Sequence, residues 1–275
     1  KSMRSIFWLV TVLLTTQTLF AQGKKLITLE DIYKNNTFKM KDVPGFKTMK
    51  DGKHYTQLEG DSTDMSIKVY NLETGAREKT IFETGMIVFA RKKHILIQNY
   101  AFSGDEKKLI LFTNGESVYR HSTKYFVILF DIETRSVTLV DNDKLMHTTM
   151  SPDCKKIAFV KENNLYLKDL ERNSINAITT DGEKNKVING NCDWVYEEEF
   201  SFTRAFQWAP DSRHLAYYRF DESQVPEFTI PKYTGLYPDL YTYKYPKAGE
   251  ANSVVSIKIF DVDKNETVTA SLGGI

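Results

Sequence analysis

Three consecutive carboxylates, Glu197, Glu198 and Glu199, are the residues of this chain best suited to chemistry. They lie in the run D-W-V-Y-E-E-E-F at 193–200, whose large apolar side chains favour burial and bring the acids toward the protein body. Consecutive strand residues face opposite sides, so two neighbouring acids converge on one ligand only from a turn or short helix. Partly buried carboxylates repel each other, and at least one pKa rises unless a cation arrives. The run therefore predicts a site that selects an ammonium group, whereas an acidic triplet without such flanks is usually a solvated surface.

The elements that position these acids are short β-strands. Runs rich in Val, Ile, Phe, Tyr and Thr alternate with turns of Gly, Asn, Asp and Pro, which is the pattern of strands. The expected strands include 66–70, 94–99, 108–112, 125–130, 156–160, 164–168, 214–219 and 256–260. One helical exception is the segment T-L-E-D-I-Y at 28–33, which has the pattern of a capped turn. The sequence predicts an all-β fold.

A repeat becomes visible when the turns are aligned. The shared aspartates are Asp51, Asp105, Asp153 and Asp211, spaced by 54, 48 and 58 residues, each in a turn before a strand. The first, third and fourth units end in hairpin tips at 71–75, 169–173 and 261–265. Four short strands in about 40–50 residues are typical of a β-propeller blade. A two-sheet sandwich is the alternative, but it does not require recurrence at this period.

Four repeats predict about four blades of an incomplete β-propeller at 49–275, preceded by a connecting segment at 22–48. The unequal repeat lengths and the abrupt end at S-L-G-G-I suggest the N-terminal piece of a longer protein. Half a propeller leaves two blade faces uncovered, so we expect the isolated piece 22–275 to aggregate or to bind hydrophobic dyes.

The first 21 residues have the pattern of a secretory signal peptide. Lys1 and Arg4 precede an apolar run at 6–14, and a small residue, Ala21, stands near the expected cleavage site. The run is shorter than the roughly 20 residues of a membrane-spanning helix. The alternatives are a buried strand and an uncleaved membrane anchor. We expect an exported protein, periplasmic or secreted.

Composition excludes several classes of function. The 37 basic and 36 acidic residues give a net charge of +1, which disfavours a nucleic-acid binder or a polybasic membrane surface. The two cysteines, Cys154 and Cys192, lack C-x-x-C spacing, and the five histidines are scattered without an H-E-x-x-H motif. We therefore expect no metal and no cofactor, and at most one disulfide.

Three segments together resemble a known family. D-W-V-Y-E-E-E-F, then W-A-P-D-S-R-H-L-A-Y-Y-R-F-D-E-S-Q-V-P, then Y-P-K-A-G-E-A-N are similar to the propeller domain of the dipeptidyl peptidase IV family, among the prolyl oligopeptidase-type serine peptidases. The resemblance runs from about residue 26 to the end. It implies an eight-bladed propeller over an α/β-hydrolase domain. It also implies release of dipeptides from free N-termini whose second residue is proline or, less well, alanine.

The resemblance also implies roles for individual residues. Glu198 and Glu199 match the glutamates that hold the ammonium of the substrate N-terminus. Arg120, in the string Y-R-H-S at 119–122, matches the arginine that contacts the carbonyl of the first substrate residue. On its own, an arginine beside tyrosine and histidine is more often a surface residue, although its planar group suits carbonyl recognition. Glu197 is expected to have a structural role.

The chain departs from the family in its catalytic residues. A nucleophile elbow reads G-x-S-x-G, followed in the chain by Asp and His. The nearest string here, G-E-S-V-Y at 115–119, lacks the final glycine and stands in the β repeat. We expect the triad, the oxyanion tyrosine, the proline pocket and the remaining blades outside this chain, which alone is expected to be inactive. No catalytic residue is assigned within it.

Three interpretations remain open. The first is a fragment of an exported dipeptidyl peptidase, the second a non-catalytic exported propeller that binds peptides or proteins, and the third a related peptidase with another length preference. The paired acids favour the first over the second, because a pure scaffold has no reason to pair acids beside Trp and Tyr.

An aromatic segment interrupts the repeat between 225 and 249. Its tyrosines and the one just upstream are Tyr218, Tyr233, Tyr237, Tyr241, Tyr243 and Tyr245. Aromatic side chains are enriched at protein contact surfaces, although an irregular blade loop is the alternative. In the family that this chain resembles, the corresponding insertion is an arm that pairs two subunits. We therefore expect a homodimer of the full-length enzyme through residues 225–249.

Overall fold

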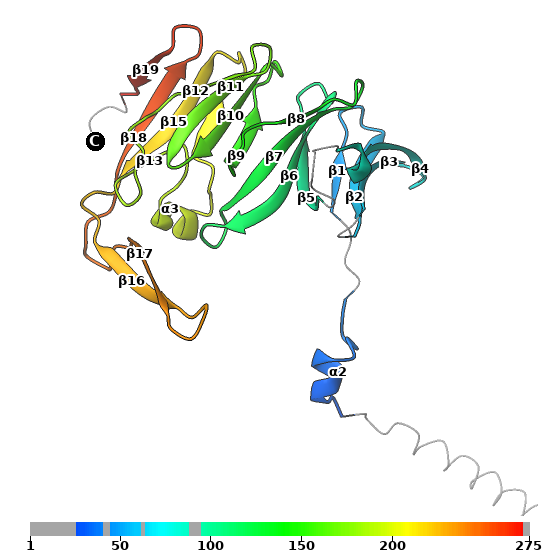
Figure 1. The fold of residues 1–275 in the computed structure, drawn as a ribbon, viewed down its shortest axis with the longest axis horizontal. Helices are drawn as coiled ribbons and strands as arrows, with labels where there is room; N and C mark the ends of the chain where they lie inside the picture. The colour runs from blue at the N-terminus through cyan, green and yellow to red at the C-terminus, as the bar shows by residue number, and fades with distance from the viewer. Residues whose placement is uncertain (1–25, 41–44, 62–63, 88–94, 272–275) are drawn as a thin grey trace, which may run out of the picture. The chain divides into compact units, whose positions relative to one another are not determined.

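The computed structural model describes residues 26–40, 45–61, 64–87 and 95–271, and strands make up about half of these residues (Figure 1). The chain divides into two units, residues 1–44 and residues 45–275. The expected signal peptide at 1–21 lies outside the described residues. No helix within the described ranges is long and apolar enough to cross a membrane.

Among its described residues, 26–40, the first unit contains the short helix α2 (Leu29–Tyr33). Its N-cap Thr28 accepts a hydrogen bond from the backbone N–H of Asp31 at 3.1 Å. In return, the Asp31 carboxylate accepts one from the backbone N–H of Thr28 at 3.3 Å. This reciprocal capping box satisfies N–H groups that have no partner within the helix. The capped turn predicted at 28–33 is confirmed.

The second unit begins with three regular antiparallel sheets of four strands each. The first consists of β1 (Phe46–Thr48), β2 (His54–Gly60), β3 (Met65–Asn71) and β4 (Arg77–Glu83), followed by the 3-10 turn η2 (Thr84–Met86). The second consists of β5 (Ile97–Phe102), β6 (Lys108–Ser117), β7 (Thr123–Asp131) and β8 (Val137–Leu139). The third consists of β9 (Met146–Met150), β10 (Lys156–Lys161), β11 (Asn164–Asp169) and β12 (Ser174–Ala177).

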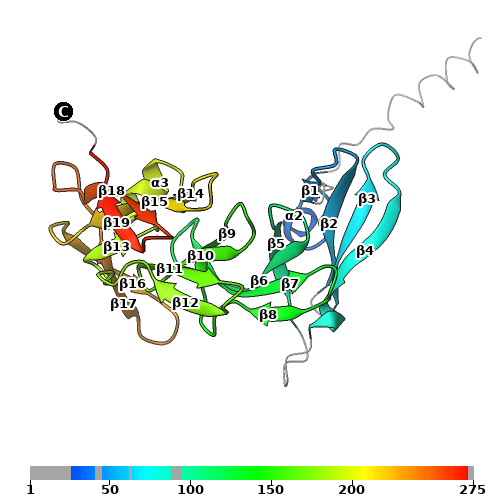
Figure 2. The same cartoon turned by 90° about the horizontal axis from the view of Figure 1, so that it is seen from above.

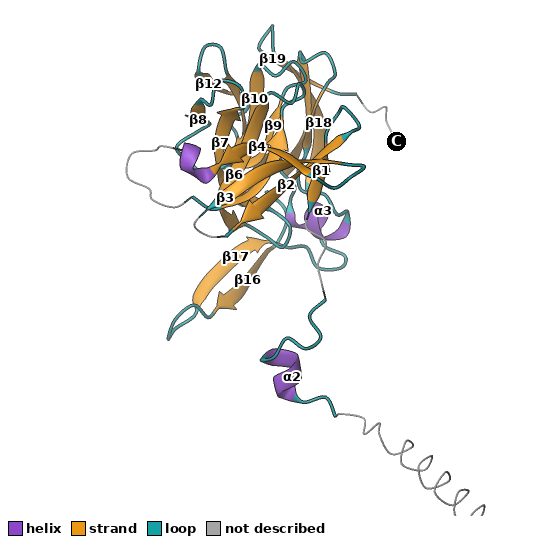
Figure 3. Ribbon diagram, turned by 90° about the vertical axis from the view of Figure 1, so that its right-hand side faces the viewer, coloured by secondary structure: helices purple, strands orange, loops and turns teal. Residues whose placement is uncertain are grey.

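The fourth sheet is interrupted twice. It is formed by β13 (Val187–Asn189), β14 (Phe206–Trp208), β15 (His214–Asp221), β18 (Val254–Asp261) and β19 (Glu266–Thr269). The helix α3 (Trp194–Glu199) lies between β13 and β14 in the chain. A separate hairpin of β16 (Glu227–Lys232) and β17 (Asp239–Lys244) lies between β15 and β18, and it projects from the sheets (Figure 3). We call this hairpin the arm.

These four sheets are four blades of a β-propeller, as the sequence predicts. The first blade starts earlier than expected, because β1 pairs with β2 through Phe46–Gln57, Lys47–Thr56 and Thr48–Tyr55. The connecting segment expected at 22–48 therefore ends before these residues, and the sheet unit starts at Gly45. The strand expected at 94–99 begins at Ile97, and His94 lies outside the described residues.

Each blade has two turns capped by a side-chain oxygen. In the first turn, the repeat aspartate accepts the backbone N–H of the residue two positions later, at distances of 2.8, 3.1, 3.1 and 2.9 Å for Asp51, Asp105, Asp153 and Asp211. In the second turn, the hairpin tip, the capping residues are Asn71, Asp131, Asp169 and Asp261. Such caps hold the chain in a tight turn, which explains the recurrence of aspartate.

The core consists of layers between adjacent blades, which stand side by side in Figure 2. Leu109 and Leu111 of β6 pack toward the first blade, in a cluster with Ile67 and Phe82. Ile110, between them in the chain, packs toward the third blade with buried residues such as Ile157 and Phe159. A third cluster joins the third blade to the fourth, and it contains Val160, Leu165, Trp208 and Leu215. Because successive side chains of a strand point to opposite faces of the sheet, each one packs against only one of the two neighbouring blades.

Candidate functional site

The acidic run forms a short helix, α3, which is one of the two local structures predicted for it. The carboxylate of Asp193 caps α3 by accepting the backbone N–H of Tyr196 at 2.9 Å, and it also accepts the hydroxyl of Ser253. Tyr196 packs over Phe220 of the fourth blade at 4.9 Å between ring centroids. This cap and this packing hold the helix against β15 and β18. Each helical residue turns by about 100°, so the three glutamates face three directions.

Glu197 faces inward and is fully buried, with 0% exposure. Its Oε1 accepts hydrogen bonds from the backbone N–H of His121 at 2.7 Å and of Ser122 at 3.0 Å. Both donors belong to the loop between β6 and β7, in the second blade. Glu197 therefore joins the second blade to α3 and does not face solvent, in keeping with a structural role.

Glu198 of α3 lies beside Arg120 of the β6–β7 loop, so their contact joins the insertion of the fourth blade to the second blade. The guanidinium Nε of Arg120 is 3.3 Å from Glu198 Oε2, and the side chains are 72% and 14% exposed, respectively. The pair thus combines a half-buried carboxylate with a guanidinium that remains open to ligands. A pair with one exposed member adds little to stability, about 0–1 kcal/mol. Its structural value is that it brings together two groups 78 residues apart in the sequence.

Glu199 faces outward and is exposed. Within the described residues, no hydrogen bond or ion pair of its side chain is found. It directly follows Glu198 in α3, about 100° further around the helix axis. The structure therefore brings Arg120 and Glu198 into contact, and it leaves Glu199 next to them without a contact to Arg120.

The arm packs against the same site through one face of β17. Tyr245, just after β17, lies against Trp194 of α3 at 4.4 Å between ring centroids. Tyr243 lies 6.3 Å from both Trp194 and Tyr119, the residue before Arg120. Sequence analysis treated these tyrosines only as contact surface. Their spacing of two residues, which places them on one face of a strand, is the signal that could have shown this packing.

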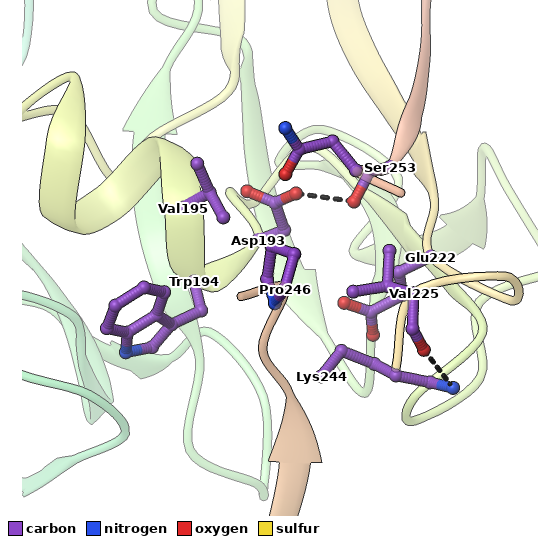
Figure 4. A pocket seen from close by; sticks show the side chains of 9 residues that line it. Asp193, Trp194, Val195, Glu222, Val225, Lys244, Pro246 and Ser253 are labelled. Carbon is purple, nitrogen blue, oxygen red and sulfur yellow. Dashed lines mark hydrogen bonds between the residues drawn. The ribbon is translucent and has the colours of Figure 1, made fainter. Parts of the chain in front are cut away.

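A narrow polar pocket lies where α3, the arm and the fourth blade meet (Figure 4). Asp193 accepts a hydrogen bond from Ser253 there, and Lys244 donates one to the carbonyl of Val225 at 2.8 Å. Burial raises the pKa of Glu222 to about 7, and the nearby charge of Asp193 adds to the effect. The pocket has no room for a water-sized sphere, so it is a junction between elements and not a ligand cavity.

A larger cavity of about 250 Å³ lies near His121, between the second, third and fourth blades. His147, which adopts a positive φ of 56°, lines it and bonds through Nε2 to Asn191 Oδ1 at 2.7 Å. Burial lowers the pKa of His147, and the charge of Arg204 acts in the same direction. His147 and Arg204 were not among the residues that sequence analysis selected.

The part of the chain that the structure describes contains no group of three His, Cys, Asp or Glu residues able to hold a metal ion. Both cysteines are free, and Cys192 is buried beneath α3. Burial raises the pKa of the Cys192 thiol, which keeps it protonated at neutral pH. The chemistry of the site therefore rests on its carboxylates, its guanidinium and its aromatic rings.

Comparison with known proteins gives consistent matches. The family model described as "Dipeptidyl peptidase IV (DPP IV) N-terminal region" matches residues 103–275. A protein from Neosartorya fischeri named "probable dipeptidyl-aminopeptidase B" is 35% identical over 219 residues, which cover 73% of this chain and 23% of that protein. A protein of the same name from Talaromyces marneffei is 35% identical over 189 residues, 62% of this chain and 21% of that protein.

Among solved structures, Porphyromonas gingivalis dipeptidyl peptidase 4 matches with a TM-score of 0.82 and 39% identity. The match covers 91% of this chain and 36% of that one. The chain thus spans between a fifth and a quarter of these two curated relatives, and about a third of the solved structure.

Proposed function

The chain belongs to the family of dipeptidyl peptidase IV N-terminal regions, and we propose that it is the substrate-recognition propeller of a serine exopeptidase. In this proposal the full-length enzyme releases N-terminal dipeptides whose second residue is proline or alanine. A catalytic domain outside these 275 residues carries out the hydrolysis. The names of the relatives, which are dipeptidyl-aminopeptidases and a dipeptidyl peptidase, support the reaction class.

The observation that carries the proposal is the contact of Arg120 with Glu198 at 3.3 Å. Glu198 and Glu199 bind the ammonium of the substrate N-terminus, and Arg120 donates to the carbonyl of its first residue. The 14% exposure of Glu198 supports this role, because charge-assisted hydrogen bonds are stronger where water is partly excluded. Arg120 keeps its planar donors available, since its side chain is 72% exposed.

This arrangement explains an exopeptidase in physical terms. The carboxylates fix where the peptide chain begins, and Arg120 orients its first carbonyl. We call these three residues, Arg120, Glu198 and Glu199, the clamp. The distance from the clamp to the catalytic serine then fixes which bond is cleaved. A peptide without a free amine offers these carboxylates no cation, so it gains none of the charge-assisted hydrogen bonds of the ammonium.

A pair of chromogenic substrates tests the proposal: a free-amine Xaa-Pro substrate and its N-acetylated form, given to the full-length enzyme. We expect cleavage of the free-amine substrate and rejection of the acetylated one. Equal cleavage of both substrates would show that the enzyme does not recognise the ammonium group, and the proposed ammonium site would be wrong. Amine-dependent binding of peptides without any cleavage would favour the alternative of a non-catalytic exported propeller.

We also propose that two copies of the full-length enzyme pair through the arm at 225–249. The tip of the arm is open to solvent, with Leu236 and Tyr237 99% and 85% exposed. Aromatic and apolar side chains of this kind are enriched in interface cores. We further propose that residues 1–21 direct export to the periplasm or the medium, which fractionation of cells expressing the full-length protein would test.

Sedimentation of the variant Leu236→Arg tests the dimer, and we expect monomers. A deletion of the arm is less informative, because it also removes Tyr243, which packs beside Trp194. Leu72→Arg, at the exposed tip of the first blade, is the matched control and should leave the dimer intact. A dimer that persists in Leu236→Arg would exclude the arm tip from the interface.

A further inference from the structure

Glu197 differs from the other two glutamates of α3 in what it contacts. It is fully buried, and its Oε1 accepts two backbone N–H groups from residues 121 and 122. These bonds join residues 75 and 76 positions apart in the chain. The donors immediately follow Arg120. The carboxylate therefore holds the loop that carries the guanidinium, although it does not touch that guanidinium.

The other hydrogen bonds of this loop close it on itself. The backbone N–H of Val118 donates to the carbonyl of Ser122 at 2.8 Å, and that of Tyr119 donates to the Ser122 hydroxyl at 3.3 Å. Such bonds preserve the shape of the loop but do not fix it relative to α3. The Arg120–Glu198 pair cannot do so either, because Arg120 is largely exposed and such pairs hold weakly. Among the described hydrogen bonds, those to Glu197 fix the loop to the helix.

We propose that Glu197 is a positioning residue that sets Arg120 opposite Glu198, and so controls recognition of the first residue of the substrate. This inference rests on the proposed function of the clamp. It assigns the three glutamates separate tasks: one anchors the loop, one pairs with the guanidinium, and one remains open. A displacement of about 1 Å in a substrate-positioning group is enough to cost about 100-fold in rate.

Glu197 could act through the length of its side chain, which lets it hold the loop, or through its charge. These two possibilities predict opposite orders of activity for two conservative variants. Glu197→Gln keeps the length of the side chain and its acceptor oxygen but removes the charge. Glu197→Asp keeps the charge but shortens the side chain by one methylene, so the oxygen no longer reaches both N–H groups. If Glu197 acts by position, Gln preserves function and Asp does not.

Steady-state kinetics of the full-length enzyme on a free-amine Xaa-Pro substrate provide the first test. We expect Glu197→Gln to retain kcat/KM within about threefold of the wild type. Glu197→Asp should lose about 10- to 100-fold. The reverse order, with Asp more active than Gln, would overturn the proposal, as would two variants of equal activity.

A double-mutant cycle with Arg120→Ala separates positioning from a general effect on the fold. If Glu197 acts through Arg120, Glu197→Asp should cost less than about threefold once the guanidinium is gone. A cost as large as in the wild-type background would show that Glu197 acts elsewhere, and would overturn the proposal.

Hydrogen exchange of the amides of residues 121 and 122 tests the anchor without any need for peptidase activity. We expect slow exchange in the wild type and in Glu197→Gln, and faster exchange in Glu197→Asp, with the blade strands unchanged. Unchanged protection in Glu197→Asp would overturn the anchor. If the wild-type enzyme cleaved no free-amine peptide, the proposed function would fail while this measurement still decided the role of Glu197.

Discussion

The third and fourth blades share one frame but differ in what they add to it. The third runs through β9–β12 without interruption between residues 146 and 177. The fourth has the same capped turns, but α3 interrupts it after β13 and the arm interrupts it after β15 (Figure 1). These two insertions contain both acids assigned to the ammonium site. They also contain Trp194 and the arm tyrosines that pack against it.

The comparison of these two blades shows which parts of a propeller have side chains available to bind a ligand. A blade strand packs alternate side chains against the two neighbouring blades, so few of its residues are free for a ligand. Ile157 and Val160, for example, belong to the clusters on opposite sides of the third blade. Insertions escape this constraint. We therefore expect changes in the third blade to affect stability, and changes in the insertions to affect recognition.

The largest effect should come from the core of the third blade. Phe159 is fully buried and stacks on Tyr166 at 5.6 Å between ring centroids. Phe159→Ala should lower the free energy of unfolding by about 3–5 kcal/mol, because a large cavity remains. Denaturant unfolding measures this, and below the transition kcat/KM should stay near the wild-type value. Ile175→Ala, at a more exposed position of β12, is the control; an equal loss there would contradict the layered core.

The next effect concerns the two acids of the fourth-blade insertion. Glu198→Gln and Glu199→Gln in the full-length enzyme should each reduce kcat/KM on a free-amine Xaa-Pro substrate. Loss of one member of a desolvated charge pair costs about 2–5 kcal/mol, which is roughly 30- to several-thousand-fold in rate. Stability should remain unchanged.

Glu171→Gln is the matched control for this pair. Glu171 lies at the exposed tip of the third blade, where it pairs with Lys155 at 3.1 Å. We expect no change in its kcat/KM. Normal activity of both Glu198→Gln and Glu199→Gln would contradict the view that the insertions serve substrate recognition while the regular blades serve stability.

A smaller effect is expected at the guanidinium. Arg120→Ala removes a hydrogen bond to a neutral carbonyl from a charged donor, which contributes about 1.5–3 kcal/mol, or roughly 10- to 150-fold in kcat/KM. Arg172→Ala, on the tip of the third blade, should have no effect on kcat/KM. An Arg120→Ala enzyme as active as the wild type would show that Arg120 makes no important contact with the carbonyl of the first substrate residue.

Much of the frame could be predicted from the sequence, because its turns depend on local chemistry. Asp51, Asp105, Asp153 and Asp211 mark the four blades correctly, since each caps its turn with nearby backbone. The tip of the second blade was missed. Arg135 holds the positive φ there, at 61°, where glycine or asparagine serves in the other tips.

The site was less predictable, because its contacts join distant segments. A site built from two neighbouring acids requires a helix or turn, and α3 is such a helix. The distance from Arg120 to Glu198 and the bonds of Glu197 to the loop depend on how the inserted helix α3 lies against the second blade. No local pattern encodes them, and only the family resemblance pointed to Arg120.

One carboxylate of the fourth blade, Glu222, responds to pH in the opposite sense to the carboxylates that cap the turns of both blades. In the third blade, backbone N–H groups lower the pKa of Asp169, and the Ser151 hydroxyl lowers that of Asp153 against the effect of burial. Their stabilisation is present above pH 3.8 and is lost as the pH falls through their lowered values. In the fourth blade, the pKa of Glu222 is raised, so its contribution must have the opposite sign.

The last predicted effect is confined to the pH dependence of stability, and Glu222 is its source. Its pKa rises from 4.5 to about 7 on folding, because burial and Asp193 disfavour the charge more than Lys244 favours it. The protonated carboxyl is therefore favoured by folding, and this contribution is complete below pH 4.5 and lost as the pH rises through 7. The unfolding free energy of the wild type relative to Glu222→Gln should fall by about 2–3 kcal/mol between pH 5 and pH 8. Buried His147 titrates in both proteins, so its contribution cancels in the difference. Denaturant unfolding at both pH values measures this, and parallel curves for the two proteins would show that Glu222 is ionised alike in the folded and unfolded states.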